Sequence, residues 1–314
     1  TAAPASPSIA DLPQAREFAY DLAQRHGFEA DQLLDQFARI RSNPRVLQLI
    51  APPSSPTQRS WERYRPRFVN AQRVAAGVEF WNENALTLAR ARALYGVPEE
   101  IIVAIIGVET VYGRNTGNFG VLEALATLAF EYPRRADFFR TELEQFLLLT
   151  RENQQDPLSV KGSYAGAIGI PQFMPGSQRR YAIDFDGDQR VDLTNSVADA
   201  IGSVARFLEQ HGWQSGQAIA VPANLPGEAA QAWLDAGIQP RLRAGDLLDQ
   251  GVQAVVASES IVTFVDLVSP GKATEYWLGY NNFYVITRYN RSSFYAMSVF
   301  HLAEEIRRAQ PLAR

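Results

Sequence analysis

One glutamate, Glu109, interrupts a segment that is otherwise apolar. The residues before it, IIVAIIGV at 101–108, predict a helix over 97–113 that is buried on all sides. Burial and a place in the last turn, at the negative end of the helix dipole, both favour a protonated carboxyl. Such a carboxyl can act as a general acid on a glycosidic oxygen. The alternative is a structural ion pair with an arginine such as Arg114, since ion pairs also perturb carboxylates.

A glycine-rich segment, GSYAGAIGIPQFMP at 162–175, is a second candidate. Its glycines allow the backbone to approach a ligand closely, while Ser163 and Gln172 offer hydrogen bonds and Phe173 and Met174 offer apolar surface. This mixture suits a sugar, which has hydroxyl rims and apolar faces. The alternative is a structural loop whose phenylalanine and methionine point into the core.

An acidic loop, DFDGDQRVDLTN at 184–195, is a third candidate. Asp184, Asp186 and Asp188 repeat the 1, 3, 5 ligand spacing of an EF-hand calcium loop, and Arg190 would supply the backbone carbonyl of position 7. Three carboxylates so close together repel each other unless a cation lies between them. We therefore predict a structural calcium site.

The match to an EF-hand is incomplete. Position 6 is Gln189 where glycine is usual, and position 12 is Asn195 where a bidentate glutamate is usual. Asp199, four residues later, could complete the ligand shell through a longer loop. The alternative is a solvated acidic turn without metal.

Composition excludes several other chemistries. The 314 residues contain no cysteine and three widely separated histidines, which rules out disulfides, thiolate chemistry and an H-E-x-x-H zinc site. A net charge of -4 argues against nucleic acid as a partner. The longest apolar run, 101–108, is far shorter than the ~20 residues of a membrane span. Chemistry must therefore rest on carboxylates, hydroxyls or amides.

The elements that must position these residues are mainly helical, with a small sheet, so the predicted class is α+β. The opening TAAPASPS is compatible with the remnant of a cleaved export signal. The proline-rich stretch at 51–57 predicts a connector. Apolar periodicity predicts two or three helices over 8–49, and further helices at 74–95, 97–113, 121–130, 136–150, 197–210 and 294–307. Runs rich in β-branched residues predict strands within 218–268, including VQAVVA and SIVTFVDLV, and one more strand, YVIT, at 284–287.

Four motifs together resemble the membrane-bound lytic transglycosylase B family of Gram-negative bacteria. They are GVETVYGRNTGNFGVLEALATLAF, RRADFF, DPLSVKGSYAGAIGIPQFMPGSQRRYAIDFDGD and GYNNFYVITRYNRSSFYAMSVFHLA, in that order, and the resemblance covers about residues 63–302. It implies a lysozyme-like helical core with an N-terminal α domain and a small antiparallel β domain. On this basis we expect a helical region at 1–75, the catalytic core with its EF-hand-like loop at 76–213, a β domain at 214–270, and a return strand and terminal helix at 271–314.

The same resemblance implies a periplasmic enzyme that cleaves peptidoglycan between N-acetylmuramic acid and N-acetylglucosamine. It makes Glu109 the single catalytic acid and base and supports calcium at the acidic loop. The side chains it implies along the glycan cleft are Tyr64, Arg134, Arg135, Ser163, Gln172, Phe173, Met174, Tyr289, Asn290 and Tyr295. Position 138 departs from the family pattern, with phenylalanine where tyrosine is expected, which puts a hydroxyl contact there in doubt.

Each implied contact has a physical role. The aromatic rings can stack on sugars or close the cleft, and Asn290 can hold an N-acetyl carbonyl. Arg134 and Arg135 can bind lactyl or stem-peptide carboxylates. The alternative for the two arginines is a solvated helix start after Pro133. Protein partners in cell-wall synthesis are left open.

The cleft motifs supply no second carboxylate, so the expected product is a 1,6-anhydromuramic end formed without water. Glu123, Glu131, Asp137 and Asp156 lie near the motifs in sequence, but each can be a plain helix-surface or turn residue. The alternatives to a lytic transglycosylase are a non-catalytic peptidoglycan-binding protein and a hydrolytic muramidase.

Overall fold

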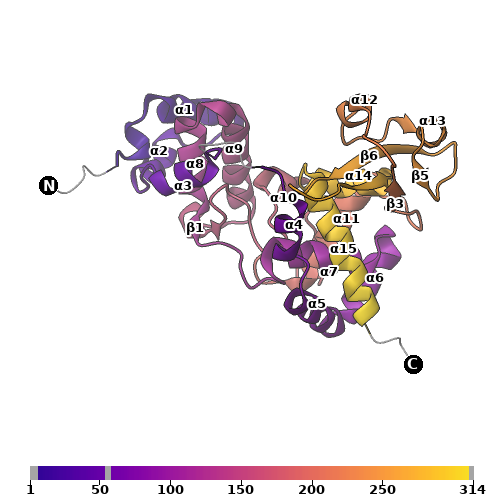
Figure 1. The fold of residues 1–314 in the computed structure, drawn as a ribbon. Coiled ribbons are helices and arrows are strands. Elements are labelled where there is room, and N and C mark those ends of the chain that lie inside the picture. The colour runs from indigo at the N-terminus through magenta and orange to yellow at the C-terminus, as the bar shows by residue number, and fades with distance from the viewer. Residues whose placement is uncertain (1–5, 54–57, 311–314) are drawn as a thin grey trace. The chain divides into compact units, whose positions relative to one another are not determined.

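The structure, a computed structural model, describes residues 6–53 and 58–310. The first five residues of the expected signal remnant and residues 54–57 of the predicted connector lie outside this part. The described residues form two compact units, which we call unit 1 (6–53 and 113–200) and unit 2 (58–112 and 201–310). Figure 1 shows the elements of each unit along the chain.

Unit 1 is helical, and its core lies between the N-terminal helices and the pair α8–α9. Phe18, Phe37 and Phe130 pack together in this core, with Phe130 contacting the other two rings edge to face. The short strands β1 and β2 pair antiparallel beside it. The elements of unit 1 are η1 (Ile9–Asp11), α1 (Pro13–His26), α2 (Ala30–Ala38), α3 (Pro44–Ile50), β1 (Phe119–Gly120), α8 (Val121–Glu131), η3 (Pro133–Arg135), α9 (Ala136–Glu152), η4 (Pro157–Ser159), β2 (Lys161–Gly162) and α10 (Pro175–Tyr181).

Unit 2 combines a helical part with the small sheet. Its helices α5, α7 and α15 pack against one another, and α14 packs on α15. The helices of unit 2 are α4 (Trp61–Tyr64), η2 (Arg65–Arg67), α5 (Ala71–Glu83), α6 (Ala85–Tyr95), α7 (Glu99–Thr110), α12 (Gln231–Asp235), α13 (Ala244–Asp249), α14 (Asn281–Tyr289) and α15 (Ser293–Ala309). A further helix, α11 (Val197–Gln210), belongs to unit 1 through Ala200 and to unit 2 beyond it.

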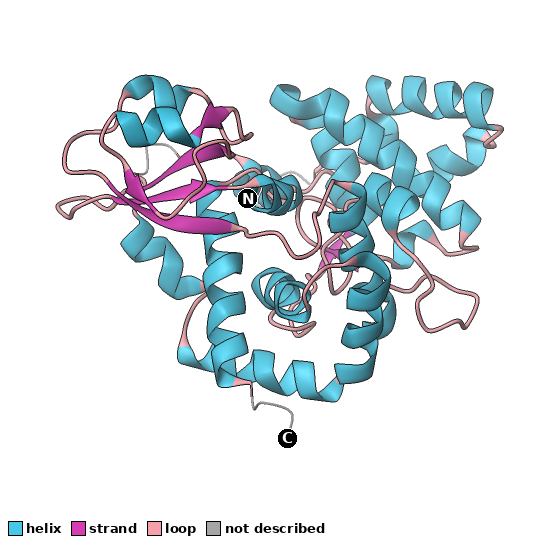
Figure 2. Ribbon diagram, turned by 90° about the vertical axis from the view of Figure 1, so that its right-hand side faces the viewer, coloured by secondary structure: helices cyan, strands magenta, loops and turns pink. Residues whose placement is uncertain are grey.

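The sheet of unit 2 has five antiparallel strands in the order β4-β6-β7-β3-β5. Figure 2 draws the strands of this sheet in magenta. Trp233 and Phe264 lie in the small core beside it, with ring centroids 5.3 Å apart. The strands are β3 (Ala220–Asn224), β4 (Leu242–Arg243), β5 (Gln253–Ala254), β6 (Ile261–Leu267) and β7 (Glu275–Gly279). The prediction of a mainly helical protein with a small antiparallel sheet is confirmed.

Three predicted elements need correction. The run YVIT at 284–287 lies inside α14 and not in a strand, because a short apolar run fits a buried helix as well as a strand. Only Gln253 and Ala254 of VQAVVA pair in the sheet, and Val255 is 93% exposed. The single helix expected at 74–95 is two helices that meet at Asn84, whose side-chain amide donates to the Phe80 carbonyl.

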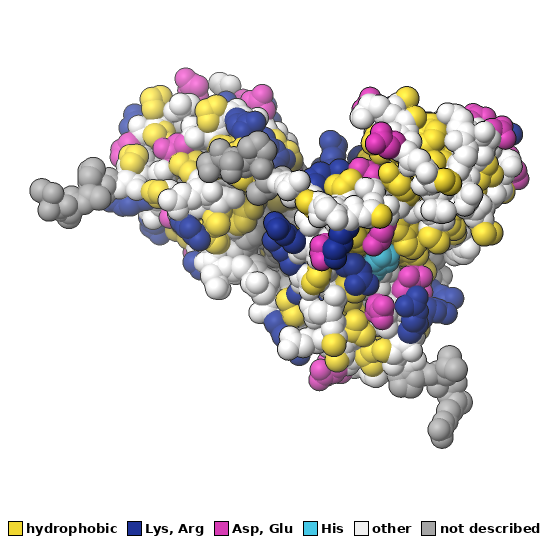
Figure 3. All heavy atoms as spheres, viewed as in Figure 1, with side chains coloured by type: hydrophobic (Ala, Val, Ile, Leu, Met, Phe, Trp, Pro, Cys, Tyr) yellow, Lys and Arg dark blue, Asp and Glu magenta, His cyan; other side chains and the backbone are white. Residues whose placement is uncertain are grey.

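The surface carries charges of both signs. Figure 3 shows basic and acidic side chains on the visible face of each unit. No helix within 6–53 and 58–310 combines the length and the apolar character that crossing a bilayer requires.

Candidate active site

Glu109 lies near the C-terminal end of α7, as the sequence predicts. The residues from Ile101 to Val108 are all buried, so α7 has no solvated face over this stretch. Glu109 itself is only partly buried, which leaves its carboxyl within reach of a ligand.

The end of α7 is fixed by an unusual backbone turn. Val111 and Tyr112 both have positive φ values, 51° and 59°, a conformation that is costly for a β-branched or bulky residue. The turn folds the Tyr112 ring back over Gly107, where an added Cβ would lie 2.6 Å from the ring. The Tyr112 hydroxyl donates to the Arg73 carbonyl at 2.7 Å, and the Arg73 guanidinium donates to the Gly107 carbonyl at 2.6 Å. These bonds tie the end of α7 to α5 directly beside Glu109.

Tyr295 is the hydrogen-bond partner of Glu109 within unit 2. Its hydroxyl donates to Glu109 Oε1 at 2.6 Å, and the Tyr295 side chain is 2% exposed. Ser292, the N-cap of α15, accepts from the Tyr295 amide at 3.2 Å and so orders the turn that carries this tyrosine.

Burial raises the pKa of Glu109 from 4.5 to about 7, and the bond from Tyr295 opposes the rise. An ion pair with an arginine, the alternative considered for this residue, would have the opposite effect on the pKa. A carboxyl with this pKa is protonated in a large fraction of molecules at neutral pH and can therefore donate a proton.

The charge of Glu109 also affects the pKa values of two further tyrosines. Burial and the negative charge of Glu109 both raise the pKa values of Tyr64 and Tyr289. The Tyr64 ring packs beside Trp61 and Phe294, with the Phe294 centroid 5.4 Å away. Unit 2 thus brings together Glu109 and three of the predicted tyrosines. Asn290 follows α14 as its C-terminal cap and is exposed.

In unit 1 the glycine-rich segment is an ordered loop. Ser163 Oγ accepts hydrogen bonds from the amides of Ala165 and Ala167 at 3.2 and 3.0 Å, and these two bonds stabilise the loop. The hydroxyl proton of Ser163 can still donate to a ligand. The Gln172 amide donates to the Thr116 and Gly169 carbonyls at 3.1 and 2.9 Å. Gln172 also has a positive φ of 54°.

The expectation that the Phe173 ring offers an apolar surface to a sugar needs correction. It is 2% exposed, and its backbone forms a two-bond bridge with Ile168. A ring that is covered in this way has no face open to a sugar, so for Phe173 the structural alternative holds. Met174 is partly buried and packs against the core of unit 1.

Arg134 and Arg135 lie in the exposed 3-10 turn η3 that precedes α9. The Arg135 guanidinium lies over the Phe138 ring, 4.2 Å from its centroid. The phenylalanine that departs from the family pattern therefore holds one of the two arginines through a cation–π contact.

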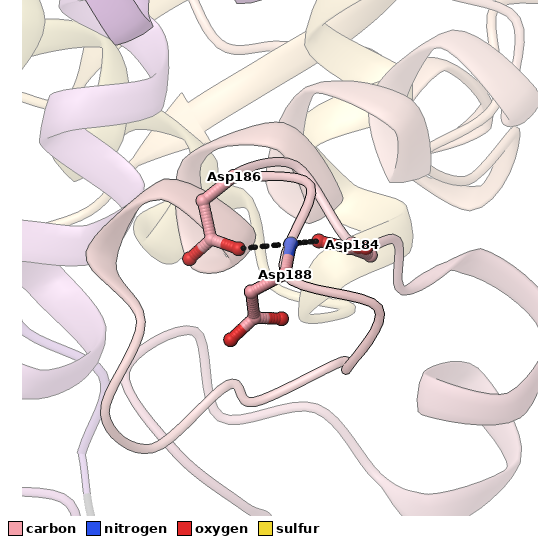
Figure 4. A group of neighbouring side chains, drawn as sticks. All are labelled: Asp184, Asp186 and Asp188. Carbon is pink, nitrogen blue, oxygen red and sulfur yellow. Dashed lines mark hydrogen bonds between the residues drawn. The ribbon is translucent and has the colours of Figure 1, made fainter.

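The acidic loop brings three carboxylates together (Figure 4). One oxygen each from Asp184, Asp186 and Asp188 lies within 4.8 Å of the others. The Asp188 amide donates to both Asp184 and Asp186, at 3.2 Å in each case. Carboxylate oxygens in a flexible loop are the donors that calcium prefers.

Two neighbouring residues shape this loop. Gln189, at the position where an EF-hand has glycine, has a φ of 72° and so adopts the conformation that the usual glycine would. Asp199 is fully buried, and its carboxylate accepts from the amides of Phe185 and Asp192 at 2.7 and 2.8 Å. Asp199 thus supports the loop from within, and its carboxylate does not belong to the three-aspartate group.

The residues that sequence reasoning missed are Tyr112 and Arg73, which fix the end of α7. Tyr112 lies within the quoted GVETVYG motif, yet nothing in its spacing reveals a fold-back onto Gly107. The hydrogen bond from Tyr295 to Glu109 was also missed, because Tyr295 was expected to line the glycan cleft, either stacking on a sugar or closing the cleft.

The chain is similar to known peptidoglycan enzymes along nearly its whole length. Residues 11–304 match the transglycosylase SLT domain. Membrane-bound lytic murein transglycosylase B of Escherichia coli (strain K12) is 43% identical over 309 residues, which cover 95% of this chain and 84% of that protein.

Several solved structures share the fold, among them the following three. Soluble lytic transglycosylase SltB1 from Pseudomonas aeruginosa has 48% identity and a TM-score of 0.89, covering 95% of this chain and 99% of that one. Lytic transglycosylase Slt35 from Escherichia coli in complex with calcium has 40% identity and a TM-score of 0.87, covering 97% and 96%. SltB3 from Pseudomonas aeruginosa in complex with NAG-anhNAM-pentapeptide has 30% identity and a TM-score of 0.81, covering 96% and 82%. The chain therefore belongs to the transglycosylase SLT domain family, that of the lytic murein transglycosylases.

Proposed function

We propose that Glu109 is the single acid and base with which this lytic murein transglycosylase cleaves peptidoglycan. The observation that carries the proposal is the setting of Glu109. It follows the buried residues of α7, and the Tyr295 hydroxyl donates to one of its carboxylate oxygens at 2.6 Å. Burial accordingly raises its pKa to about 7. Among the described residues no other carboxylate contributes to this pKa, although a neighbouring negative charge would raise it further. A single carboxyl whose pKa lies near neutral pH can both donate a proton and take one up.

In the first step Glu109 donates its proton to the glycosidic oxygen as the bond to C1 of N-acetylmuramic acid breaks. The oxocarbenium charge that develops at C1 needs a partner. The most direct partner is the sugar's own N-acetyl carbonyl oxygen, which Asn290 can hold in place through its amide. Glu109 is then an anion, stabilised by the Tyr295 hydroxyl.

In the second step Glu109 takes the proton of the C6 hydroxyl of the same muramic acid. The freed oxygen attacks C1 within one sugar, at a high effective molarity, and forms the 1,6-anhydro ring. Water is not consumed, and Glu109 returns to its protonated state. The NAG-anhNAM-pentapeptide bound to SltB3 has this kind of anhydro end and supports the assignment.

The carboxylates considered as a second acid have other partners. Glu123 accepts from the Asn43 amide at 3.0 Å, Glu131 accepts from Ser42, and Asp156 caps η4 through the Leu158 amide. Asp137 is an exposed residue in the first turn of α9. These engagements favour a mechanism with one carboxylate over the two-carboxylate chemistry of a hydrolase.

The glycan contacts follow from exposure and chemistry. In unit 2 we assign Tyr64, Tyr289 and Asn290 to sugar binding, while Tyr295 positions Glu109. In unit 1 we assign the Ser163 hydroxyl, the Gln172 amide, Met174, and the Arg134 and Arg135 guanidinium groups, the last two for carboxylates of the substrate. These assignments extend the family's activity to named residues of this chain.

We also propose that the acidic loop binds calcium in a structural role and that the enzyme acts in the periplasm. The three clustered carboxylates and the positive φ of Gln189 fit an EF-hand-like loop, and Slt35 binds calcium. Calcium would neutralise the repulsion among Asp184, Asp186 and Asp188. The periplasm is the compartment in which a murein enzyme of this family meets its substrate.

The proposal is tested with Glu109→Gln, which keeps the size of the side chain but cannot donate a proton. We expect at least ~10³-fold loss of turnover on insoluble peptidoglycan with glycan binding retained. Mass spectrometry of the wild-type digest should show anhydromuramic ends. Turnover within tenfold of wild type would refute Glu109 as the acid, and products heavier by one water with reducible ends would identify a muramidase.

A further inference from the structure

Arg73, on α5, has hydrogen-bond partners that a need to neutralise its charge does not explain. Its guanidinium donates to two main-chain carbonyls, that of Gly107 at 2.6 Å and that of Arg67 at 3.3 Å. Burial lowers its pKa, and no carboxylate in the described part of the chain opposes this effect. A partly buried cation without an anionic partner is costly. The property that this position uses is therefore the planar fork of arginine, which can donate to two acceptors at once.

The two carbonyls belong to the segments that carry Glu109 and Tyr64. Gly107 lies two residues before Glu109, in the last turn of α7. Arg67 is the last residue of η2, which begins directly after Tyr64. Arg73 therefore connects the turn that bears the proposed acid to the segment that bears a proposed sugar contact.

Two aromatic rings extend this connection toward the sugar contact. The Arg73 guanidinium lies 5.9 Å from the centroid of the Phe68 ring, which lies 5.2 Å from the centroid of the Tyr64 ring. Burial and, after it, the negative charge of Glu109 raise the pKa of Tyr64, so these two side chains are close in space. A shift of the segment after Tyr64 relative to α7 would change the distance between a bound sugar and the Glu109 carboxyl.

The turn that follows Glu109 has a backbone conformation that is costly by itself. Val111 and Tyr112 have consecutive positive φ values of 51° and 59°, which glycine adopts far more readily. Such a backbone persists only where the surrounding structure enforces it, and it is found mostly at functional sites. Two of the enforcing contacts meet at Arg73, because its side chain donates to the Gly107 carbonyl and its own carbonyl accepts from the Tyr112 hydroxyl at 2.7 Å.

We propose that Arg73 is a positioning residue, which fixes the distance between the Glu109 carboxyl and the sugar that rests on Tyr64. The proposal rests on the proposed function, in which Glu109 is the acid and Tyr64 contacts the glycan. A general acid must lie within hydrogen-bond reach of the glycosidic oxygen, and a misplacement of about 1 Å can cost on the order of 10²-fold in rate. Arg73 acts through the two carbonyls and not by contact with the substrate.

The first test is Arg73→Lys, which keeps the positive charge but replaces the planar fork by a shorter side chain with a compact ammonium. On soluble glycan strands we expect kcat to fall about 10- to 100-fold while KM changes less than about threefold, because alignment is lost and binding is not. The pH at which kcat/KM falls on the alkaline side should stay near 7, since burial and the Tyr295 bond set the pKa of Glu109. Wild-type kcat in the folded variant overturns the proposal, and so does a shift of this pH, which would show an effect on the ionisation of Glu109 in place of its position.

Arg151→Lys is the matched control, because Arg151 also donates from one helix, α9, to a carbonyl at the end of another, that of His26 in α1, at 2.7 Å. Its kcat and KM should equal those of the wild type, and a loss equal to that in Arg73→Lys would overturn the proposal. Should Arg73→Lys fail to fold, Tyr112→Phe removes the bond to the Arg73 carbonyl and keeps the ring. Its kcat should fall about three- to tenfold at unchanged KM, and wild-type kcat in this variant would overturn the proposal.

The last test adds Arg73→Lys to Glu109→Gln, in order to separate the positioning role from the function on which it rests. No further loss of turnover is expected, because this protein has no acid left to position. A further loss as large as the one that Arg73→Lys causes alone would show that Arg73 acts by another route, and it would overturn the proposal. Turnover near wild type in Glu109→Gln alone would refute Glu109 as the acid and the positioning role with it. Wild-type kcat in Arg73→Lys beside an inactive Glu109→Gln would refute the positioning role alone.

Discussion

Replacing Tyr295 by phenylalanine separates the two forces that set the pKa of Glu109. Burial raises this pKa to about 7, and the bond from the Tyr295 hydroxyl, 2.6 Å long, lowers it. Phenylalanine keeps the ring and the burial but removes the donor. The pKa should therefore rise further.

The size of the rise follows from the hydrogen bond. A hydrogen bond to a charged group contributes about 1.5–3 kcal/mol, and one pKa unit corresponds to about 1.4 kcal/mol, so the shift should be roughly one to two units. The general acid must be protonated, so wild-type activity is lost as the pH rises through about 7. In Tyr295→Phe the alkaline loss should move to a pH of roughly 8 to 9.

The assay is the pH dependence of kcat/KM for release of soluble muropeptides, which reports ionisations of the free enzyme. At pH 8 only about a tenth of wild-type Glu109 is protonated, against half or more in the variant. The test depends on the pH at which kcat/KM falls on the alkaline side and not on its maximal value, because lost substrate contacts lower activity at every pH.

Tyr20→Phe, at a tyrosine that is 57% exposed in unit 1, is the matched control and should leave the limb where it is. An alkaline limb that stays near pH 7 in Tyr295→Phe, or moves to lower pH, would show that the Tyr295–Glu109 bond does not set the ionisation that governs catalysis.

Three further outcomes are expected. The pKa of Glu109 is higher in the folded than in the unfolded state, so the free energy of unfolding of the wild type falls as the pH rises from about 4.5 to 7. Glu109→Gln lacks this ionisation and should be more stable than the wild type by up to about 3 kcal/mol at pH 8, but similar to it at pH 4. Urea unfolding at the two pH values measures the difference. A chelator should lower the melting temperature of the wild type and added calcium should restore it, whereas the melting temperature of Asp186→Asn should change little with either. A wild-type melting temperature that is unchanged by the chelator, together with no metal found by elemental analysis, would contradict the calcium site. Gln189→Gly should raise stability by about 1 kcal/mol, because Gln189 has a φ of 72°, and a destabilised variant in thermal melts would show that its side chain matters more than its backbone.

Local sequence carried enough information to find the helix that holds Glu109, the proposed catalytic acid. The apolar run before Glu109 has the composition of a helix with no solvated face, and α7 has this character. Helix α11 occupies the predicted residues 197–210, because its apolar face recurs with helical spacing. The aspartates at 184, 186 and 188 come together because neighbours two residues apart cannot separate far within a tight turn.

Long-range packing decided the rest. The hydrogen bond between Glu109 and Tyr295 joins residues 186 positions apart, and no local pattern encodes such a pair. The YVIT run is intrinsically ambiguous, and contact with α15 selects its helical form as part of α14. Whether Phe173 faces a ligand or the interior depends on which surfaces cover it.

The sequence by itself therefore determined the family, the place of Glu109 in an apolar helix and the acidic loop, because these depend on residue type and short spacing. Only the tertiary structure decided the pKa of Glu109 and the fold-back of Tyr112 over Gly107. Burial and charge pairing are properties of neighbours in space, and the chain brings those neighbours from distant positions only when it folds.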